Sequence, residues 1–195
     1  MAAIGITGGI GCGKSSFTRC LRDLLPTATF FDADAMAREL TLHDPAVRAE
    51  IRNRFGAAII DESDQLNRSA LRAIVFAAPE KRRELEKILH PRIRAHWSGE
   101  AARHRDSIFI ADIPLLYETA GEQHCDRVVV VACTPELQLT RLIERTGMEQ
   151  KEAERIVAAQ MPLSEKVRRA DHVVWNNGPM QVLGEQAKLL VSLWR

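Results

Sequence analysis

Short apolar runs alternate with longer amphipathic stretches along the chain of 195 residues. The run from Val128 to Val131 is β-branched throughout and has no polar face, which predicts a central strand buried on both sides. We expect strands over residues 3–6, 29–31, 107–111, 127–132 and 172–175. Strands that alternate with helical segments predict a parallel sheet with helices on both faces.

Two helices are clearly marked at their ends. Residues 14–25 place Phe17, Leu21 and Leu24 along one helix face, and Pro26 ends the pattern. A second helix is expected from Thr134, which is suited to be its N-cap, to a position near Gly147.

The middle of the chain has a different pattern. Between residues 35 and 105 there is no strong strand signal, and residues 79–90 are strongly helical. We therefore expect a helical insertion in an otherwise alternating α/β chain.

Composition narrows the range of partners. The chain has 27 Lys plus Arg against 26 Asp plus Glu, a net charge of +1, so no overall field attracts nucleic acid or an anionic membrane. It has no apolar run of the roughly 18 residues that a membrane span needs and no secretory signal pattern. We expect a cytoplasmic protein without nucleic-acid or membrane partners, as a monomer or weak homo-oligomer. The four cysteines form no C-x-x-C pair, so reduced thiols are expected, with Cys20 and Cys133 in the core.

Residues 8–15, called the phosphate loop below, read G-G-I-G-C-G-K-S and fit the pattern G-x-x-x-x-G-K-[ST]. The loop lies between a predicted strand and a predicted helix, as phosphate binding requires. Its glycines, including Gly9, Gly11 and Gly13, let main-chain N–H groups approach phosphate oxygens closely. The helix start behind them adds partial positive charge.

The polar residues of the loop extend this prediction to ATP with Mg²⁺. Lys14 can reach the β- and γ-phosphates, and the Ser15 hydroxyl can bind the metal ion. Ser16, the next helix residue, and Cys12 are counted with the nucleotide-binding residues. Cys12 occupies a variable loop position, where its thiol is tolerated; alternatively, the helix start and Lys14 lower its pKa and make it oxidisable.

Three carboxylates follow predicted strands, where ligands of open α/β sheets collect. Asp32 and Asp34 follow the second strand and Asp112 follows the third. A kinase that acts on an alcohol needs one carboxylate to take the hydroxyl proton and others to complete the Mg²⁺ shell. The alternatives are an N-cap of the next helix for Asp32 or Asp34, and a turn acid for Asp112.

Five blocks of sequence, in this order, resemble the dephospho-CoA kinase family. They are residues 7–15, 32–38, 89–91, 114–118 and 176–178. Each later block alone is a weak signal, but together with the phosphate loop they are specific. Cys12 stands where the family often has Ser, and Trp175 stands where an acid is common; Trp175 could stack on a base or close the core.

The resemblance implies a three-layer P-loop NTPase fold with a five-stranded parallel sheet, a helical substrate domain and a small lid. The implied core is 1–33, 106–140 and 168–195, with an insertion at 34–105 and a lid at 141–167. The implied reaction moves the γ-phosphoryl group of ATP to the ribose 3′-hydroxyl of dephospho-CoA, the last step of coenzyme A synthesis.

Site residues also follow from the resemblance. Asp34 is the implied general base, with Asp32 as the alternative, and Lys14 assists catalysis. The acceptor site is expected to include the following residues: Arg38, His90, Asp112, Pro114 and Leu115.

Arg141 and Arg145 are four residues apart on one helix face, so both guanidinium groups can converge on a phosphate as it transfers. The alternative is an exposed face paired with Glu144 or Glu149. Asn177 lies in an Asn-Asn-Gly turn whose amides can meet an adenine edge, although such a turn forms without a ligand too.

Two other functions compete with this interpretation. Another small-molecule or nucleoside monophosphate kinase would share the loop and the lid, because a fold does not fix the acceptor. A nucleotide-dependent switch would bind without useful turnover, but the N-K-x-D segment expected of a GTPase is absent from the sequence.

Overall fold

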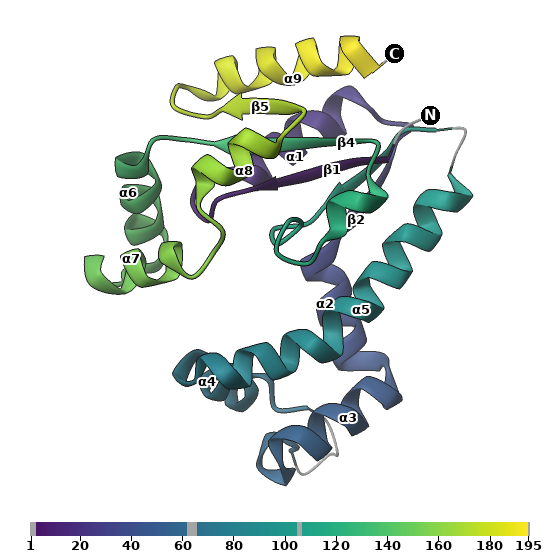
Figure 1. The fold of residues 1–195 in the computed structure, drawn as a ribbon, viewed down its shortest axis with the longest axis vertical. Coiled ribbons are helices and arrows are strands. Elements are labelled where there is room, and N and C mark those ends of the chain that lie inside the picture. The colour runs from purple at the N-terminus through teal and green to yellow at the C-terminus, as the bar shows by residue number, and fades with distance from the viewer. Residues whose placement is uncertain (1–2, 62–65, 105–106, 195) are drawn as a thin grey trace. The chain divides into compact units, whose positions relative to one another are not determined.

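The computed structural model describes residues 3–61, 66–104 and 107–194. The chain divides into two compact units, one made of residues 1–31 and 100–195 and the other of residues 32–99 (Figure 1). The expected boundary between residues 105 and 106 lies outside the described residues.

A five-stranded sheet forms the centre of the first unit, in the order β2-β3-β1-β4-β5 (Figure 1). Its strands are β1 (Ala3–Gly8), β2 (Thr29–Asp32), β3 (Phe109–Asp112), β4 (Arg127–Ala132) and β5 (His172–Trp175). β1 pairs in parallel with β3 and β4, and β4 pairs in parallel with β5. The predicted parallel sheet is therefore confirmed, and the β-branched run in β4 occupies an inner strand.

One face of the sheet is covered by α1 (Lys14–Leu24) and α9 (Met180–Trp194), which lie side by side. Successive side chains of a strand point to opposite faces, so Ile4 and Ile6 of β1 both face these helices. They join a core of fully buried side chains that includes Val129, Phe17 and Leu21. Burial of this apolar area is the main force that holds the two helices on the sheet.

The opposite face is covered by the segment that follows β3 and by α8 (Leu163–Arg169). Gly5 of β1 faces this side, where a Cβ atom would lie 2.7 Å from Leu116 Cδ2 and 2.8 Å from Cys125 Sγ. A short 3₁₀ turn, η2 (Gly121–His124), completes the covering segment. With both faces covered, the unit has the three layers expected of the P-loop NTPase fold.

After the carboxyl end of β4 the chain forms two helices in succession, α6 (Pro135–Thr146) and α7 (Gln150–Ala158). Thr134 caps α6 by accepting a hydrogen bond from the Leu137 N–H group, as the sequence predicts. Gly147 ends the helix in a left-handed conformation with φ 69°, which glycine adopts without strain.

The second unit contains α2 (Ala33–His43), α3 (Pro45–Phe55), the 3₁₀ turn η1 (Ala57–Ile59) and α4 (Arg68–Ala77). Asp44 and Asn67 cap α3 and α4 by accepting main-chain N–H groups of the first turn. In the part of the chain that the structure describes, no helix has the length and apolar character required to cross a bilayer.

The last helix of this region, α5 (Pro79–Arg103), is longer than the expected 79–90 because it continues through Pro91. A proline inside a helix removes one main-chain hydrogen bond. The loss is offset here because the apolar residues on both sides of it, Ile88, Leu89 and Ile93, are buried. From Glu100 onward the helix belongs to the first unit.

The core of the first unit gives a direct stability test. Leu21→Ala should lower the free energy of unfolding by about 2–5 kcal/mol, because Leu21 is fully buried and its truncation leaves a cavity. Leu189→Ala, a matched change at a leucine that is 62% exposed, should change it by less than about 0.5 kcal/mol. Urea unfolding followed by circular dichroism measures both; equal effects would contradict the assigned core.

Candidate active site

The phosphate loop connects β1 to α1 and turns through two glycines with positive φ. Gly11 has φ 78° and Gly13 has φ 87°, values that side chains with a Cβ rarely adopt. A Cβ on Gly13 would also overlap the side-chain amide of Asn176. The two glycines therefore fix the path of the loop both through their dihedral angles and through close packing.

The start of α1 has no side-chain cap. Gly13 occupies the N-cap position, and no hydrogen bond from a side chain of the described residues satisfies the first turn. In contrast, α2, α3, α4 and α6 are each capped by a side chain. Free N–H groups and the positive end of the helix dipole make this helix start suited to an anion such as phosphate.

Lys14, the first residue of α1, forms an ion pair with Asp112 at the carboxyl end of β3. The other oxygen of Asp112 accepts a hydrogen bond of 2.8 Å from the Thr18 hydroxyl, one turn further along α1. Asp112 is buried, so both of its oxygens need partners. The pair fixes the lysine ammonium group beside the phosphate loop.

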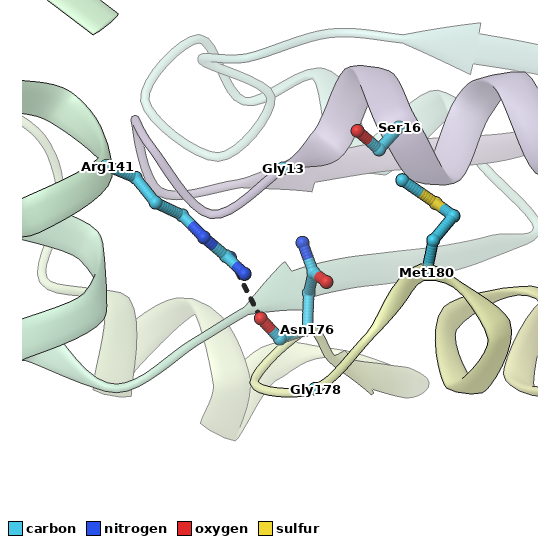
Figure 2. Close-up of a pocket in the computed structure, with 6 residues that line it drawn as sticks. All are labelled: Gly13, Ser16, Arg141, Asn176, Gly178 and Met180. Atoms are coloured by element: carbon cyan, nitrogen blue, oxygen red, sulfur yellow. Dashed lines mark hydrogen bonds between the residues drawn. The ribbon is translucent and has the colours of Figure 1, made fainter. Parts of the chain in front are cut away.

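A pocket of about 300 Å³ lies beside the uncapped start of α1 (Figure 2). Its lining residues are Gly13, Ser16, Arg141, Asn176, Gly178 and Met180. Figure 2 shows the Arg141 side chain extending from α6 toward the turn after β5, where it donates a hydrogen bond of 2.8 Å to the Asn176 carbonyl. The pocket thus joins a guanidinium group, an amide and an apolar thioether next to the loop.

The turn after β5 is tied to the phosphate loop by Asn176, whose side-chain N–H donates to the Cys12 carbonyl at 2.9 Å. The neighbouring Asn177 is exposed, and its side-chain oxygen accepts the Thr134 N–H at 2.9 Å. Asn176, not the predicted Asn177, therefore lines the pocket. Trp175 is 47% exposed, which excludes the suggestion that it closes the core.

Two glutamines that the sequence analysis did not identify hold the tip of the loop. Gln138 of α6 donates to the Ile10 carbonyl at 2.8 Å, and Gln160 accepts the Ile10 N–H at 3.1 Å. Both main-chain groups of Ile10 are therefore satisfied by side chains from the region after β4. No local sequence signal distinguishes these glutamines from ordinary polar helix residues.

Lys166 of α8 is fully buried, which is rare for lysine. Its ammonium group lies 2.8 Å from Glu118 Oε1 and 3.3 Å from each of the Gly8 and Pro114 carbonyl oxygens. Three acceptors match the three N–H groups of an ammonium ion. Glu118 Oε1 also accepts the Met161 N–H at 3.0 Å. The lysine thus joins the base of the phosphate loop to the segments after β3 and α7.

The sequence analysis missed Lys166, although a weak signal was present. Lys166 stands three residues after Leu163 and four before Ala170, on the apolar side of a short helix. Glu118 was noted only as part of a family block. A charged residue on an apolar stripe next to a candidate acidic partner is the pattern that could have identified the pair.

The remaining predicted site residues of the first unit are Pro114, Leu115, Ser15 and Arg145. Pro114 and Leu115 follow β3 directly and are half-buried, and the Pro114 carbonyl also accepts the Thr7 hydroxyl at 2.9 Å. Ser15 and Arg145 are exposed. Of the two arginines on α6, only Arg141 lines the pocket.

The other predicted residues belong to the second unit. Asp32 Oδ1 accepts the Ala35 N–H at 2.9 Å, so the capping alternative is confirmed for Asp32, although the helix begins at Ala33. Asp34 lies in the first turn of α2, and Arg38 is four residues further on the same helix face. His90 of α5 is half-buried, and burial lowers its pKa below the ordinary value.

The phosphate loop ends in a lysine and a hydroxyl residue, which are the first two residues of α1. This distinguishes it from the loops of dinucleotide-binding folds, in which the lysine is absent. The covered parallel sheet and the loop together define a nucleotide-binding protein of the P-loop class.

Comparison with known proteins identifies the group within this class. The sequence profile described as dephospho-CoA kinase matches residues 2–181, and the chain belongs to that family. It is 42% identical to the dephospho-CoA kinase of Anaeromyxobacter dehalogenans over 99% of this chain and 92% of the relative. It is 39% identical to that of Symbiobacterium thermophilum over 100% of this chain and 81% of the relative.

A solved structure supports the same assignment. The dephospho-CoA kinase from Campylobacter jejuni is similar to this fold with a TM-score of 0.71 and 25% sequence identity. The match covers 97% of this chain and 95% of the other. The family resemblance that the sequence blocks indicated is thereby confirmed.

The buried lysine leads to a second stability prediction. Lys166→Met should lower the free energy of unfolding by about 3 kcal/mol, the lower end of the range for a broken buried ion pair, because Glu118 keeps 21% of its side chain exposed. In the double variant with Glu118→Gln, at least about 1 kcal/mol should be recovered, because no charge is then left unpaired.

Lys151→Met is the matched control, since Lys151 is exposed on α7. Denaturant unfolding of the unchanged protein, the two single variants Lys166→Met and Glu118→Gln and the double variant measures the coupling between the two residues, with the control alongside. A single-variant loss no larger than that of the control would show that the Lys166 charge does not hold the loop.

Proposed function

We propose that this chain transfers the γ-phosphoryl group of ATP to the ribose 3′-hydroxyl of dephospho-CoA. The observation that carries the proposal is the phosphate loop, with its uncapped helix start and Lys14, in a chain that matches the dephospho-CoA kinase profile over residues 2–181. The loop accounts for phosphate binding, and membership of the family indicates dephospho-CoA as the acceptor.

ATP binding rests on the main chain of the loop. The N–H groups at the start of α1 receive the phosphate oxygens, and Lys14 moves from Asp112 to the β- and γ-phosphates as a point charge. Asp112 remains fixed by the Thr18 hydroxyl during this change. The contact with Asp112 and the contact with phosphate are both charge-assisted, so the exchange replaces one strong interaction of Lys14 by another.

A divalent metal ion fits this site. The Ser15 hydroxyl, exposed on the first turn of α1, is an oxygen donor of the kind that Mg²⁺ prefers, and Asp112 provides a carboxylate behind it. When bound together with ATP, Mg²⁺ neutralises charge on the β- and γ-phosphate oxygens.

The pocket lined by Arg141 receives the rest of the nucleotide. The Met180 side chain offers an apolar surface to a base, and the Asn176 and Gly178 turn offers amide groups. Arg141 is also available to a developing negative charge on the transferring group, with Arg145 on the same face of α6 as the second candidate.

The acceptor hydroxyl needs a base, and Asp34 is proposed for this role. Its carboxylate lies in the first turn of α2 and is a group that can take the proton of an alcohol. Asp32 uses one carboxylate oxygen to cap the same helix, and the preference for Asp34 rests on the family pattern.

The second unit, with Arg38 and His90, is proposed as the substrate domain, and Pro114 and Leu115 as part of the acceptor wall. Arg38 carries the positive charge that a phosphate-containing acceptor requires. Residues 141–167 are proposed as the lid, because this segment carries Arg141, Arg145 and Gln160, whose side chain accepts the Ile10 N–H. Lids of this kind exclude water while a phosphoryl group transfers.

The function is tested by incubating the protein with MgATP and dephospho-CoA and locating the new phosphate by phosphorus NMR. Phosphate should appear on the ribose 3′-oxygen, and Lys14→Ala should abolish turnover because the ammonium group is lost. Lys188→Ala, a matched change at an exposed lysine of α9, should behave as the unchanged protein. Transfer to a different alcohol, with dephospho-CoA left untouched, would refute the proposed acceptor.

The two neighbouring carboxylates can be separated by kinetics. Asp34→Asn should lower kcat by about 10²- to 10⁴-fold with little change in ATP affinity, as expected for loss of a general base. Asp32→Asn keeps an oxygen that can cap α2 and should lower kcat far less. Steady-state rates and nucleotide titrations check both; a larger loss in Asp32→Asn would assign the base to Asp32.

A further inference from the structure

Two of the four free cysteines meet behind the phosphate loop. The Sγ atoms of Cys12 and Cys133 are 3.4 Å apart, although the residues are separated by 121 positions in the sequence. Both residues are buried, with exposed fractions of 0% and 1%. Because a disulfide has an S–S distance of about 2.05 Å, the sulfurs need to approach by only ~1.3 Å to form one.

The two thiols are electrostatically unequal. The hydrogen bond between the two thiols, together with the nearby Arg141 guanidinium group, lowers the pKa of Cys133. The same hydrogen bond and burial raise the pKa of Cys12. In the singly ionised pair, Cys133 is therefore the thiolate and Cys12 keeps its proton. A thiolate next to a second thiol is one feature of cysteines that oxidise reversibly, whereas the burial of this pair makes its oxidation slow.

We propose that Cys12 and Cys133 form an oxidation site that takes a small two-electron oxidant, such as hydrogen peroxide, and closes to a disulfide that weakens nucleotide binding. Neither the family assignment nor the phosphate-transfer reaction requires this site. The effect of the disulfide is measured as a change in nucleotide affinity, so the result of the test does not depend on the identity of the acceptor.

The oxidation is balanced in two steps. The Cys133 thiolate attacks a peroxide oxygen, an S–O bond forms, the O–O bond breaks, and hydroxide leaves and is protonated to water. The Cys12 sulfur then attacks the Cys133 sulfur, the S–S bond forms, and the S–O bond breaks as hydroxide leaves with the Cys12 proton as a second water. Two thiols are oxidised to one disulfide, and peroxide is reduced to two waters.

The disulfide would change the conformation of the phosphate loop because Cys12 is part of it. Cys12 lies between Gly11 and Gly13, the two glycines with positive φ that pack closely against Gln138 and Asn176, so a shift of its main chain disturbs these contacts of the loop. Its N–H group donates to the Gly9 carbonyl at 3.1 Å, and its carbonyl accepts the Asn176 amide. A displacement of about 1 Å at a positioned group can lower a catalytic rate by about 10²-fold. We expect a shift of this size in the loop to weaken ATP binding by at least about tenfold.

Thermodynamic linkage gives a second, independent expectation. If the disulfide weakens ATP binding, ATP must stabilise the dithiol by the same factor. Saturating MgATP should therefore raise the midpoint potential of the pair, by about 30 mV for each tenfold difference in affinity. Burial of both sulfurs makes the exchange slow, so equilibrium has to be approached from the oxidised and the reduced side.

The test begins with the reduced full-length protein, which is equilibrated in buffers of oxidised and reduced dithiothreitol or treated with hydrogen peroxide. Free thiols are alkylated, and peptide mass spectrometry identifies the linked pair. A fluorescent ATP analogue with Mg²⁺ reports affinity. The expected result is a Cys12–Cys133 cross-link, a loss of affinity of about tenfold or more, and recovery of both on full reduction.

Matched variants separate this pair from the other cysteines. Cys133→Ser should bind the analogue as the unchanged protein does and should keep its affinity after peroxide; Cys133→Ala serves if the serine variant does not fold. Cys20→Ser should remain sensitive, because Cys20 is not part of the pair. The proposal is overturned if no Cys12–Cys133 link forms in the most oxidising buffer, if the linked protein binds nucleotide unchanged, or if Cys133→Ser loses affinity like the unchanged protein.

Discussion

A helix start without a side-chain cap is costly unless something else satisfies its N–H groups, and α1 begins in this way at Gly13. A side chain caps α2, α3, α4 and α6, whereas α7 and α8 also lack such a cap. The uncapped groups of α1 are the ones proposed to hold phosphate. Several elements of the first unit hold the phosphate loop in a conformation that leaves this helix start uncapped.

The loop is held from outside by side chains that arise far along the sequence. Gln138 and Gln160 satisfy the main chain of Ile10, Asn176 binds the Cys12 carbonyl, and Lys166 binds the Gly8 carbonyl. These contacts come from the half of the chain that includes α6 to β5. The loop is thus preorganised by tertiary contacts as well as by the dihedral angles and close packing of its glycines.

Sequence analysis predicted what depends on local physics. The strands, the capped start of α6 and the phosphate loop follow from β-branched runs, cap residues and glycine spacing, and they are confirmed. The extent of α5 was underestimated, because Pro91 is a local signal to stop and the burial of Ile93 beyond it is not visible in sequence. β3 also begins two residues later than expected, since the Ser107 N–H donates to the His104 carbonyl.

The site residues that the sequence did not reveal share one property. Lys166 reaches the Gly8 carbonyl across 158 positions, so its burial depends on acceptors that no local pattern can specify. Asp32 shows the opposite case, because capping is a local interaction and was foreseen as an alternative. The roles of Asp34, Arg38 and His90 rest on the family pattern and stay predictions.

The position of β1 in the sheet has one more consequence. β1 is hydrogen-bonded on both sides, to β3 and β4, and therefore has no free edge. Its amides can exchange with deuterium only through openings that approach global unfolding, whereas α6 and α7 stand outside the sheet and can fray separately. Native fluctuations should therefore loosen α6 and α7 long before they reach β1, the strand that leads into the phosphate loop.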